Sequence, residues 1–143
     1  MSASAKPAPR GGFFLQVVPA LLYTFAIFYG GVTQPPSVGA PALFQQDKLL
    51  HAIAFAFMQL VMLRAVRYEG QKLGFRAQNL LAFGLACAIG GLLELVQLTT
   101  SYRSAELLDF VADAFGAGIV AAVLDWRAKK RQETCAPPAE PEG

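Results

Sequence analysis

Uncharged, largely apolar segments alternate with short polar ones along the whole chain. Asp, Glu, Lys and Arg are absent from residues 11–46, 49–63, 77–93 and 114–124. A bilayer core of about 30 Å is crossed by roughly 20 helical residues, and each apolar segment reaches that length with its flanks. The pattern therefore predicts an all-α membrane protein, a bundle of four transmembrane helices at Phe13–Thr33, Lys48–Arg67, Gln78–Leu98 and Glu106–Trp126.

Proline content and length distinguish the connections between these helices. Pro19 should kink the first helix near its start, because proline lacks the N–H that the helical ladder needs. Gln34–Gln46 contains three prolines and is expected to be a stiff, non-helical loop. Thr99–Ala105 has only seven residues, so the third and fourth helices should form an antiparallel hairpin. Outside the membrane domain at 13–126, we expect an N-terminal tail at 1–12 and a disordered tail at 127–143.

Composition narrows the class of protein. Hydrophobic residues make up 55% of the 143 residues and charged residues 15%, against roughly 25% charged residues in an average soluble domain. So little charge argues against a water-soluble enzyme domain, and a net charge of +2 argues against nucleic-acid binding. Cys87 and Cys135 should lie at different membrane depths, so no disulfide is expected. With a single His and no Cys-x-x-Cys spacing, neither a zinc site nor a cofactor is expected.

Lysine and arginine are distributed unevenly between the two ends of the predicted helices. Nine of them fall at one end: Lys6, Arg10, Arg67, Lys72, Arg76, Arg127, Lys129, Lys130 and Arg131. Only Lys48 and Arg103 fall at the other end. The positive-inside rule then places both termini in the cytoplasm. The first apolar run exceeds the 7–15 residues of a signal peptide, so we expect it to be retained as a helix.

Ionisable and amide side chains gather at the outer ends of the predicted helices. They come from segments far apart in the sequence: Asp47, Lys48, His51, Glu94, Gln97, Arg103, Asp109 and Asp113. At 1.5 Å of rise per residue they fall within an outer slab on the order of 10 Å thick. Charged groups face lipid unfavourably, so we expect them to point into the bundle or into an outward-open pocket. They should form one outward-facing polar site, with Glu94 opposite Asp109. In the inner halves only Arg64 is comparable, and its long side chain can reach the cytoplasmic surface.

A purely structural role is the alternative for each of these residues. At the start of the second helix, Asp47 suits a helix cap, Lys48 an interfacial cation and His51 an interfacial hydrogen bond. The acids of the third and fourth helices suit a structural charge network with Lys48 or Arg103, and Gln97 suits an interhelical hydrogen bond. The small residues of Ala112-x3-Gly116 and Ala114-x3-Gly118 favour close packing of the fourth helix in either case.

Three strings in the second to fourth helices resemble a known family. They are DKLLHAIAFAF at Asp47–Phe57, ELVQLTTSYR at Glu94–Arg103 and DFVADAFGAG at Asp109–Gly118. Their order and spacing resemble the VanZ-like family of small bacterial membrane proteins, over about Asp47–Leu124. Asp113 stands where that family often has Asn, which adds an acid to the predicted site. The family is named for a protein linked to resistance to the glycopeptide antibiotic teicoplanin. The resemblance implies a multi-pass protein of the bacterial cytoplasmic membrane.

Three functional classes fit these residues. One is a binding module, in which Lys48, His51 and Arg103 engage an anionic, lipid-headgroup or glycopeptide-related ligand. Another is an enzyme, in which His51 or a buried carboxylate acts as acid or base on a lipid-linked envelope precursor. The third is a small proton-coupled transporter, for which four helices per chain would require a homo-oligomer. We rank the binding module first, with membrane lipids as partners. A divalent cation could bind only if the fold gathers Glu94, Asp109 and Asp113 around His51.

Overall fold

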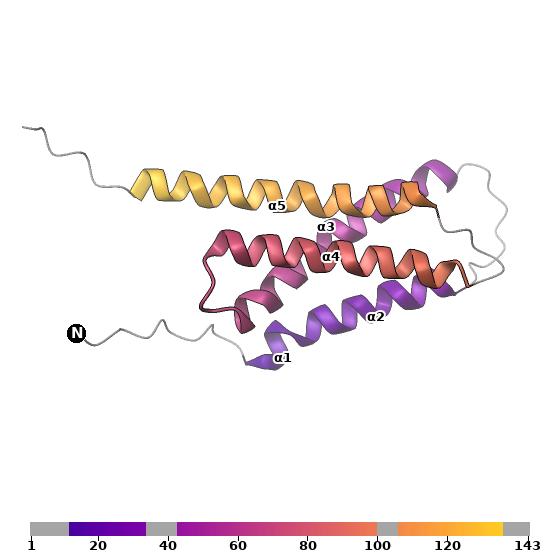
Figure 1. Cartoon of the computed structure of the whole chain (residues 1–143), viewed down its shortest axis with the longest axis horizontal. Coiled ribbons are helices and arrows are strands. Elements are labelled where there is room, and N and C mark those ends of the chain that lie inside the picture. Colours follow the sequence, from indigo (N-terminus) through magenta and orange to yellow (C-terminus); the bar gives the residue numbers. More distant parts are fainter. Residues whose placement is uncertain (1–11, 34–42, 100–105, 136–143) are drawn as a thin grey trace, which may run out of the picture.

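The computed structural model describes residues 12–33, 43–99 and 106–135, with the backbone only for residues 43–47 and 135. Its elements are helices: α1 (Phe13–Gln16), α2 (Val18–Val32), α3 (Leu43–Glu69), α4 (Phe75–Gln97) and α5 (Leu107–Cys135). The four longer helices lie side by side, and α1 lies at the same end of the bundle as the carboxyl end of α5 (Figure 1). The predicted all-α fold is confirmed for the described residues.

Three of the helices are long and apolar enough to cross a membrane. They are Lys48–Glu69 within α3, Phe75–Gln97 in α4 and Leu107–Thr134 within α5. The first segment contains the second predicted span, and the other two contain the third and fourth predicted spans except for Leu98 and Glu106. Val18–Val32 in α2 is apolar but shorter. Length and composition of these helices therefore indicate a membrane protein.

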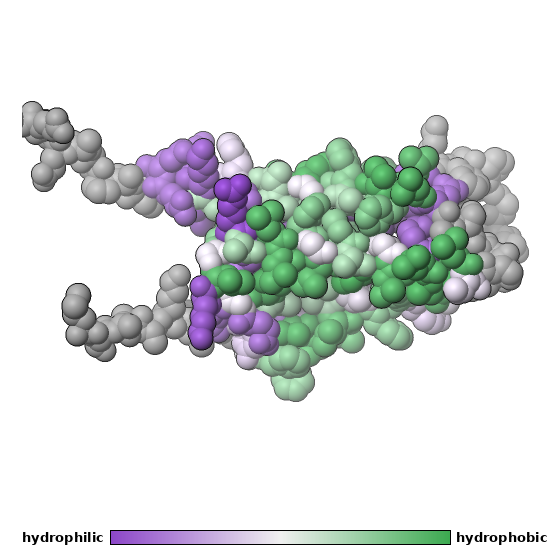
Figure 2. Space-filling view, viewed as in Figure 1, coloured by the Kyte–Doolittle hydropathy of each residue, from purple (hydrophilic) through white to green (hydrophobic). Residues whose placement is uncertain are grey.

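The distribution of side chains points the same way, because large apolar groups face outward. Phe14, Phe25 and Phe115 are 79%, 69% and 65% exposed. Asn79 and Asp113, in contrast, are fully buried inside the bundle. A broad apolar band lies between the more polar ends of the molecule (Figure 2). Such an inside-out pattern suits lipid, which accepts apolar side chains but satisfies no hydrogen bond.

The first apolar segment is interrupted near its start. α1 ends at Gln16 and α2 begins at Val18, one residue before Pro19. The ring of a proline inside a helix clashes with the carbonyl four residues earlier, here that of Leu15, and its nitrogen donates no hydrogen bond. In the first turn of α2 neither effect is costly, because these backbone groups have no helical partner there. The predicted kink is therefore a break in the helix at Val17.

α3 begins earlier than the sequence predicted. Residues 43–46 were expected in a non-helical loop, but the helix starts at Leu43. The last proline before it is Pro41, and no glycine or proline follows until Gly70. Nothing in the local sequence therefore stops the helix from extending beyond the apolar run. The rest of the predicted loop, residues 34–42, lies outside the described residues.

α5 likewise continues beyond its apolar run. Residues 127–135 were predicted to be disordered, but they are helical up to Cys135. This segment consists mainly of Arg, Lys, Ala, Gln and Glu, which are good helix formers, and the next proline is Pro137. The prediction of disorder was wrong there because a charged composition does not by itself end a helix. Residues 136–143 lie outside the described residues, as do residues 1–11 of the N-terminal tail.

α3 is the centre of the bundle and contacts each of the other four helices. α4 and α5 also pack against each other, as expected for a hairpin, and α2 packs on α3 and α4. α3 and α5 lie very close together at Gly116, where an added Cβ would overlap the backbone carbonyl of Ala52. The close packing predicted from the small residues is confirmed at this position. It sets the start of α5 directly against the first turns of α3.

Candidate functional site

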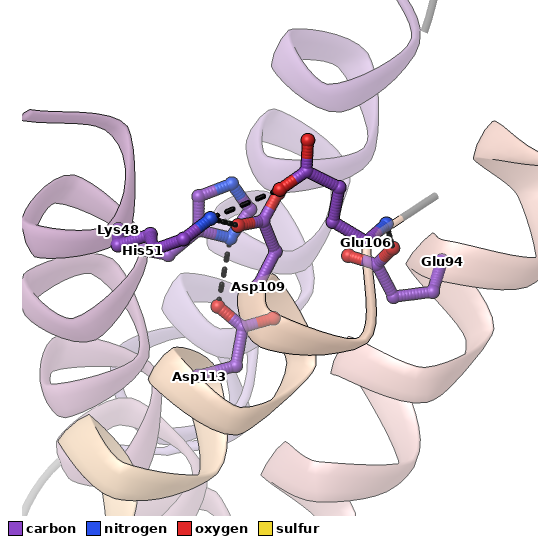
Figure 3. Close-up of polar contacts among 6 residues, drawn as sticks. All are labelled: Lys48, His51, Glu94, Glu106, Asp109 and Asp113. Atoms are coloured by element: carbon purple, nitrogen blue, oxygen red, sulfur yellow. Dashed lines mark hydrogen bonds and ion pairs between the residues drawn. The ribbon is translucent and has the colours of Figure 1, made fainter. Parts of the chain in front are cut away.

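Six ionisable side chains converge at the end of the bundle opposite the carboxyl end of α5. This cluster, called the polar site below, consists of Lys48, His51, Glu94, Glu106, Asp109 and Asp113 (Figure 3). Helical spacing explains the convergence, because residues three or four positions apart share one face of a helix. Lys48 and His51 are three positions apart on α3. Glu106, Asp109 and Asp113 are three and four positions apart, with Glu106 directly before α5 and the other two on it.

Lys48 connects α3 to the start of α5 through two ion pairs. Its Nζ lies 3.0 Å from Oε2 of Glu106 and 3.1 Å from Oδ1 of Asp109. The Asp109 side chain is only 10% exposed, whereas those of Lys48 and Glu106 are each 36% exposed. The ammonium group therefore partly neutralises the carboxylates of Glu106 and Asp109 at the rim of the site. The deeper carboxylates have other partners.

His51 and Asp113 form the deepest pair of the polar site. Nδ1 of His51 lies 2.9 Å from Oδ1 of Asp113, whose side chain is fully buried. An ionised carboxylate only accepts hydrogen bonds, so Nδ1 carries the proton in this contact when Asp113 is charged. Within the described residues, the other carboxylate oxygen, Oδ2, is buried without a hydrogen-bond partner. It faces Gly90 of α4, where an added Cβ would lie 3.0 Å away.

Glu94 connects α4 to the start of α5. Its Oε2 accepts a hydrogen bond of 3.0 Å from the backbone N–H of Glu106. This N–H lies just before the first turn of α5, where backbone donors have no partner within the helix. Oε1 of Glu94 is buried and has no hydrogen-bond partner among the described residues. One carboxylate oxygen of Glu94 and one of Asp113 are thus buried without a hydrogen-bond partner among the described residues.

The charge of the described site is predominantly negative. Four carboxylates stand against the ammonium of Lys48 and the imidazole of His51. Across residues 12–33, 43–99 and 106–135, no group of three or more His, Cys, Asp or Glu side chains has the arrangement of a metal site. The arrangement therefore suits hydrogen-bond donors such as hydroxyl or amino groups, which carboxylate oxygens accept.

The structure brings together five of the eight residues predicted from the sequence: Lys48, His51, Glu94, Asp109 and Asp113. Gln97 is also buried, but its Nε2 donates to the carbonyl of Gly31, 3.1 Å away, so it connects α4 to α2. Arg103 and the side chain of Asp47 lie outside the described residues.

The predicted pairing of Glu94 with Asp109 differs in detail from what is observed. The carboxylate of Asp109 turns toward Lys48, while Glu94 meets the backbone of Glu106 (Figure 3). Glu106 was not predicted as a member of the site. Its position three residues before Asp109 is the signal that identifies it, since this spacing puts both acids on one helix face.

A second polar cluster, which the sequence did not predict, lies in the other half of the bundle. This amide network consists of Gln59, Asn79 and Asp125. Nε2 of Gln59 donates to Oδ1 of Asn79 at 2.9 Å, and Nδ2 of Asn79 donates to Oδ1 of Asp125 at 2.9 Å and to the carbonyl of Ala121 at 2.8 Å. The expectation that only Arg64 is comparable in this half was therefore wrong. Lone polar residues inside apolar runs were the available signal.

An apolar groove of about 210 Å³ runs alongside the polar site. It lies between α2 and α3. Gly30 and Gly31 line it on α2, Phe55 lines it on α3 and Leu93 lines it on α4. His51 is its ionisable lining residue. The same side chain therefore contacts the deepest carboxylate and borders an apolar space, here called the α2–α3 groove.

Comparisons with protein-family models, curated proteins and solved structures found no match for this chain. What the chain does is therefore inferred from its own residues. Two features carry that inference: a carboxylate-rich polar site with buried acceptor oxygens, and an apolar groove that shares His51 with it.

Proposed function

We propose that this chain is a membrane protein that binds a lipid-type ligand, with the headgroup at the polar site and a hydrocarbon chain in the α2–α3 groove. The observation that carries the proposal is the position of His51, which lines the groove and contacts Asp113. A ligand that joins a polar headgroup to an apolar chain matches this arrangement. Binding sites of this kind combine an apolar lining with a few placed polar groups.

The chemistry of the headgroup follows from the buried acceptors. Lys48 already engages two carboxylates, so it offers little uncompensated positive charge to an anion. Oδ2 of Asp113 and Oε1 of Glu94 have no hydrogen-bond partner within the described part of the chain. We therefore favour a lipid headgroup or glycopeptide-related group that carries hydroxyl or amino donors over a purely anionic one. A lipid-linked envelope precursor belongs to the same chemical class.

Family, topology and location form part of the same proposal. The ordered strings at Asp47–Phe57, Glu94–Arg103 and Asp109–Gly118 support membership of the VanZ-like family and a bacterial cytoplasmic membrane. The excess of lysine and arginine at one end supports cytoplasmic termini, with α1 and α2 as a first span before the other three. Reporter fusions after Gly143 and within residues 34–42 are then expected on opposite sides. The same side for both would contradict the four-span topology.

The binding proposal is tested by filling the groove. Gly30→Leu adds a side chain to the groove lining, at a position where an added Cβ has nothing within 4 Å. Gly84→Leu is the matched control, since Gly84 is exposed on α4, has equally open space and does not line the groove. Each protein is extracted with its native lipids in polymer nanodiscs, and the lipids are identified by mass spectrometry. We expect a lipid class enriched with the wild type and Gly84→Leu but not with Gly30→Leu.

Asp113→Asn tests the headgroup side of the same site. The amide preserves the size of the side chain but replaces a carboxylate oxygen, so the enriched lipid should be lost while the thermal unfolding midpoint stays close to that of the wild type. The control measurement is unfolding of each purified variant in neutral detergent. If Gly30→Leu and Asp113→Asn both retain the wild-type lipid profile, the proposed function is wrong.

One observation favours an enzyme as the second candidate. A buried carboxylate that holds a histidine at 2.9 Å is the arrangement by which proteins orient a general acid or base. If the protein is an enzyme, the wild type should convert a component of a bacterial lipid extract, and the His51→Gln variant should not. Unchanged lipids after incubation with the wild type would favour binding without chemistry.

A further inference from the structure

A larger cavity lies at the other end of the bundle, far along α3 from the polar site. Its volume is about 570 Å³, and it is lined by α1, the last turns of α3, the connection to α4 and the first residues of α4. It shares no lining residue with the α2–α3 groove. What it binds is therefore a separate question from the function proposed for the polar site.

The charge of this cavity is opposite to that of the polar site. Arg64 and Arg67 line it, and none of the described residues that line it is acidic. The two arginines are three positions apart on α3, which places both guanidinium groups on one face. Two cations without a facing carboxylate make a site for an anion, and the planar guanidinium fork matches phosphate oxygens.

Both arginines are positioned by neighbouring side chains. Nε of Arg64 donates a hydrogen bond of 2.8 Å to Oε1 of Gln16 on α1. The guanidinium carbon of Arg67 lies 5.8 Å from the centre of the Phe75 ring on α4. Among the described residues, no hydrogen bond or ion pair engages the terminal nitrogens of either arginine. Their donors are therefore oriented and available to a ligand.

The depth and the apolar part of the lining indicate where the anion comes from. Arg67 lies two residues before the end of α3 at Glu69, which is the end of a candidate membrane span. Leu60, Leu63 and Leu73 line the same cavity. A ligand that fits has a phosphate at the level of the interface and hydrocarbon next to it. Basic pockets between membrane helices bind anionic lipid headgroups by this combination.

We propose that this cavity binds the phosphate group of an anionic phospholipid, held by the guanidinium groups of Arg64 and Arg67. A free phosphate ion offers the same oxygen atoms to the two arginines. The apolar lining favours the lipid as the source, because it has no role toward a free ion. The site is independent of the proposed function, since none of the six polar-site residues contributes to it.

The test uses the full chain purified in a neutral detergent. Phosphatidylglycerol, phosphatidylcholine and inorganic phosphate are titrated separately, and the thermal unfolding midpoint is recorded, because a ligand that binds the folded state raises it. Native mass spectrometry counts the lipids that stay bound. We expect phosphatidylglycerol to raise the midpoint of the wild type, with a half-effect concentration about tenfold higher for Arg64→Gln and for Arg67→Gln.

Arg131→Gln is the matched control, because it removes the same charge from an exposed position on α5 outside the cavity. It should respond to phosphatidylglycerol as the wild type does. Arg64→Lys should fall between the wild type and Arg64→Gln, since lysine keeps the charge but lacks the fork. An equal loss in Arg131→Gln, or an equal response to phosphatidylcholine, would overturn the proposal. A response to inorganic phosphate as large as that to phosphatidylglycerol, with the same arginine dependence, would overturn the lipid as its source.

Discussion

Two buried polar clusters lie in the two halves of the same bundle, and they differ in how their hydrogen bonds are completed. The amide network of Gln59, Asn79 and Asp125 connects α3, α4 and α5 through neutral donors, a carboxylate and a backbone carbonyl. The polar site connects the same three helices through charged groups and leaves carboxylate oxygens of Glu94 and Asp113 without partners in the described residues.

The difference separates a stabilising cluster from one that is suited to a ligand. The network also has a buried oxygen without a partner, Oε1 of Gln59, among the residues described. A neutral amide oxygen costs much less to bury than an oxygen of an ionised carboxylate. The carboxylates of Glu94 and Asp113, each with one oxygen that has no partner among the described residues, therefore carry a larger cost, which a ligand with hydrogen-bond donors would offset.

Gly116→Ala should have the largest effect, because it acts on both clusters. The added Cβ overlaps the carbonyl of Ala52, so α3 and α5 must separate between the polar site and the network. Overpacking of this kind costs about 3 kcal/mol. Gly118→Ala is the control, because its Cβ would lie an ordinary 3.6 Å from the Phe83 ring. Reversible unfolding in detergent and denaturant mixtures measures both. Equal stability of the two variants would contradict the close approach.

Asn79→Leu should destabilise the protein without affecting the ligand. It removes three side-chain hydrogen bonds, each worth about 0.6 kcal/mol in a membrane bundle, or about 2 kcal/mol together. Gln59→Leu is a useful companion, because it also removes the unpartnered oxygen and should cost less. The free energy of unfolding and the lipids retained in nanodiscs are measured side by side. Loss of the enriched lipid in a folded Asn79→Leu protein would mean that the network takes part in binding.

Lys48→Gln should have a smaller effect on stability than Asn79→Leu, because the ion pairs of Lys48 lie at the rim of the site. Removing the ammonium leaves Asp109, which is 10% exposed, without its cation. Asp109→Asn should therefore lessen the effect of Lys48→Gln when the two are combined. A double-mutant cycle in the unfolding assay measures this coupling. Strictly additive effects would show that the ion pair does not help to hold α3 and α5 together.

Glu94→Gln should have the smallest effect on stability. The amide oxygen of Gln can still accept the hydrogen bond from the backbone N–H of Glu106, so the loss should be about 0.5 kcal/mol or less. The amount of protein in the membrane should stay near that of the wild type, while the enriched lipid is lost. Quantitative blotting of membranes and lipid analysis of the same sample provide the measurement. A fall in abundance in step with lipid loss would favour a structural role for Glu94.

The sequence by itself determined the all-α class and the three long apolar helices, because crossing a bilayer requires about 20 apolar residues in a row, which is a local property. It also determined that Lys48, His51, Glu94, Asp109 and Asp113 lie near one end of the bundle. Depth in a helix follows directly from residue number at 1.5 Å per residue. Helix ends were predicted less well at Leu43 and Cys135, because hydropathy does not report where a polar segment stays helical.

Only the tertiary structure decided which polar groups meet. Lys48 pairs with Glu106 as well as Asp109, and Gln97 donates a hydrogen bond to the carbonyl of Gly31 on α2. These pairings depend on how each helix is rotated about its axis and how closely it approaches its neighbours. Both are set by packing contacts between distant segments, above all where Gly116 of α5 lies against Ala52 of α3. A residue's depth follows from its position along its own helix, whereas its partner depends on the helix that packs against it.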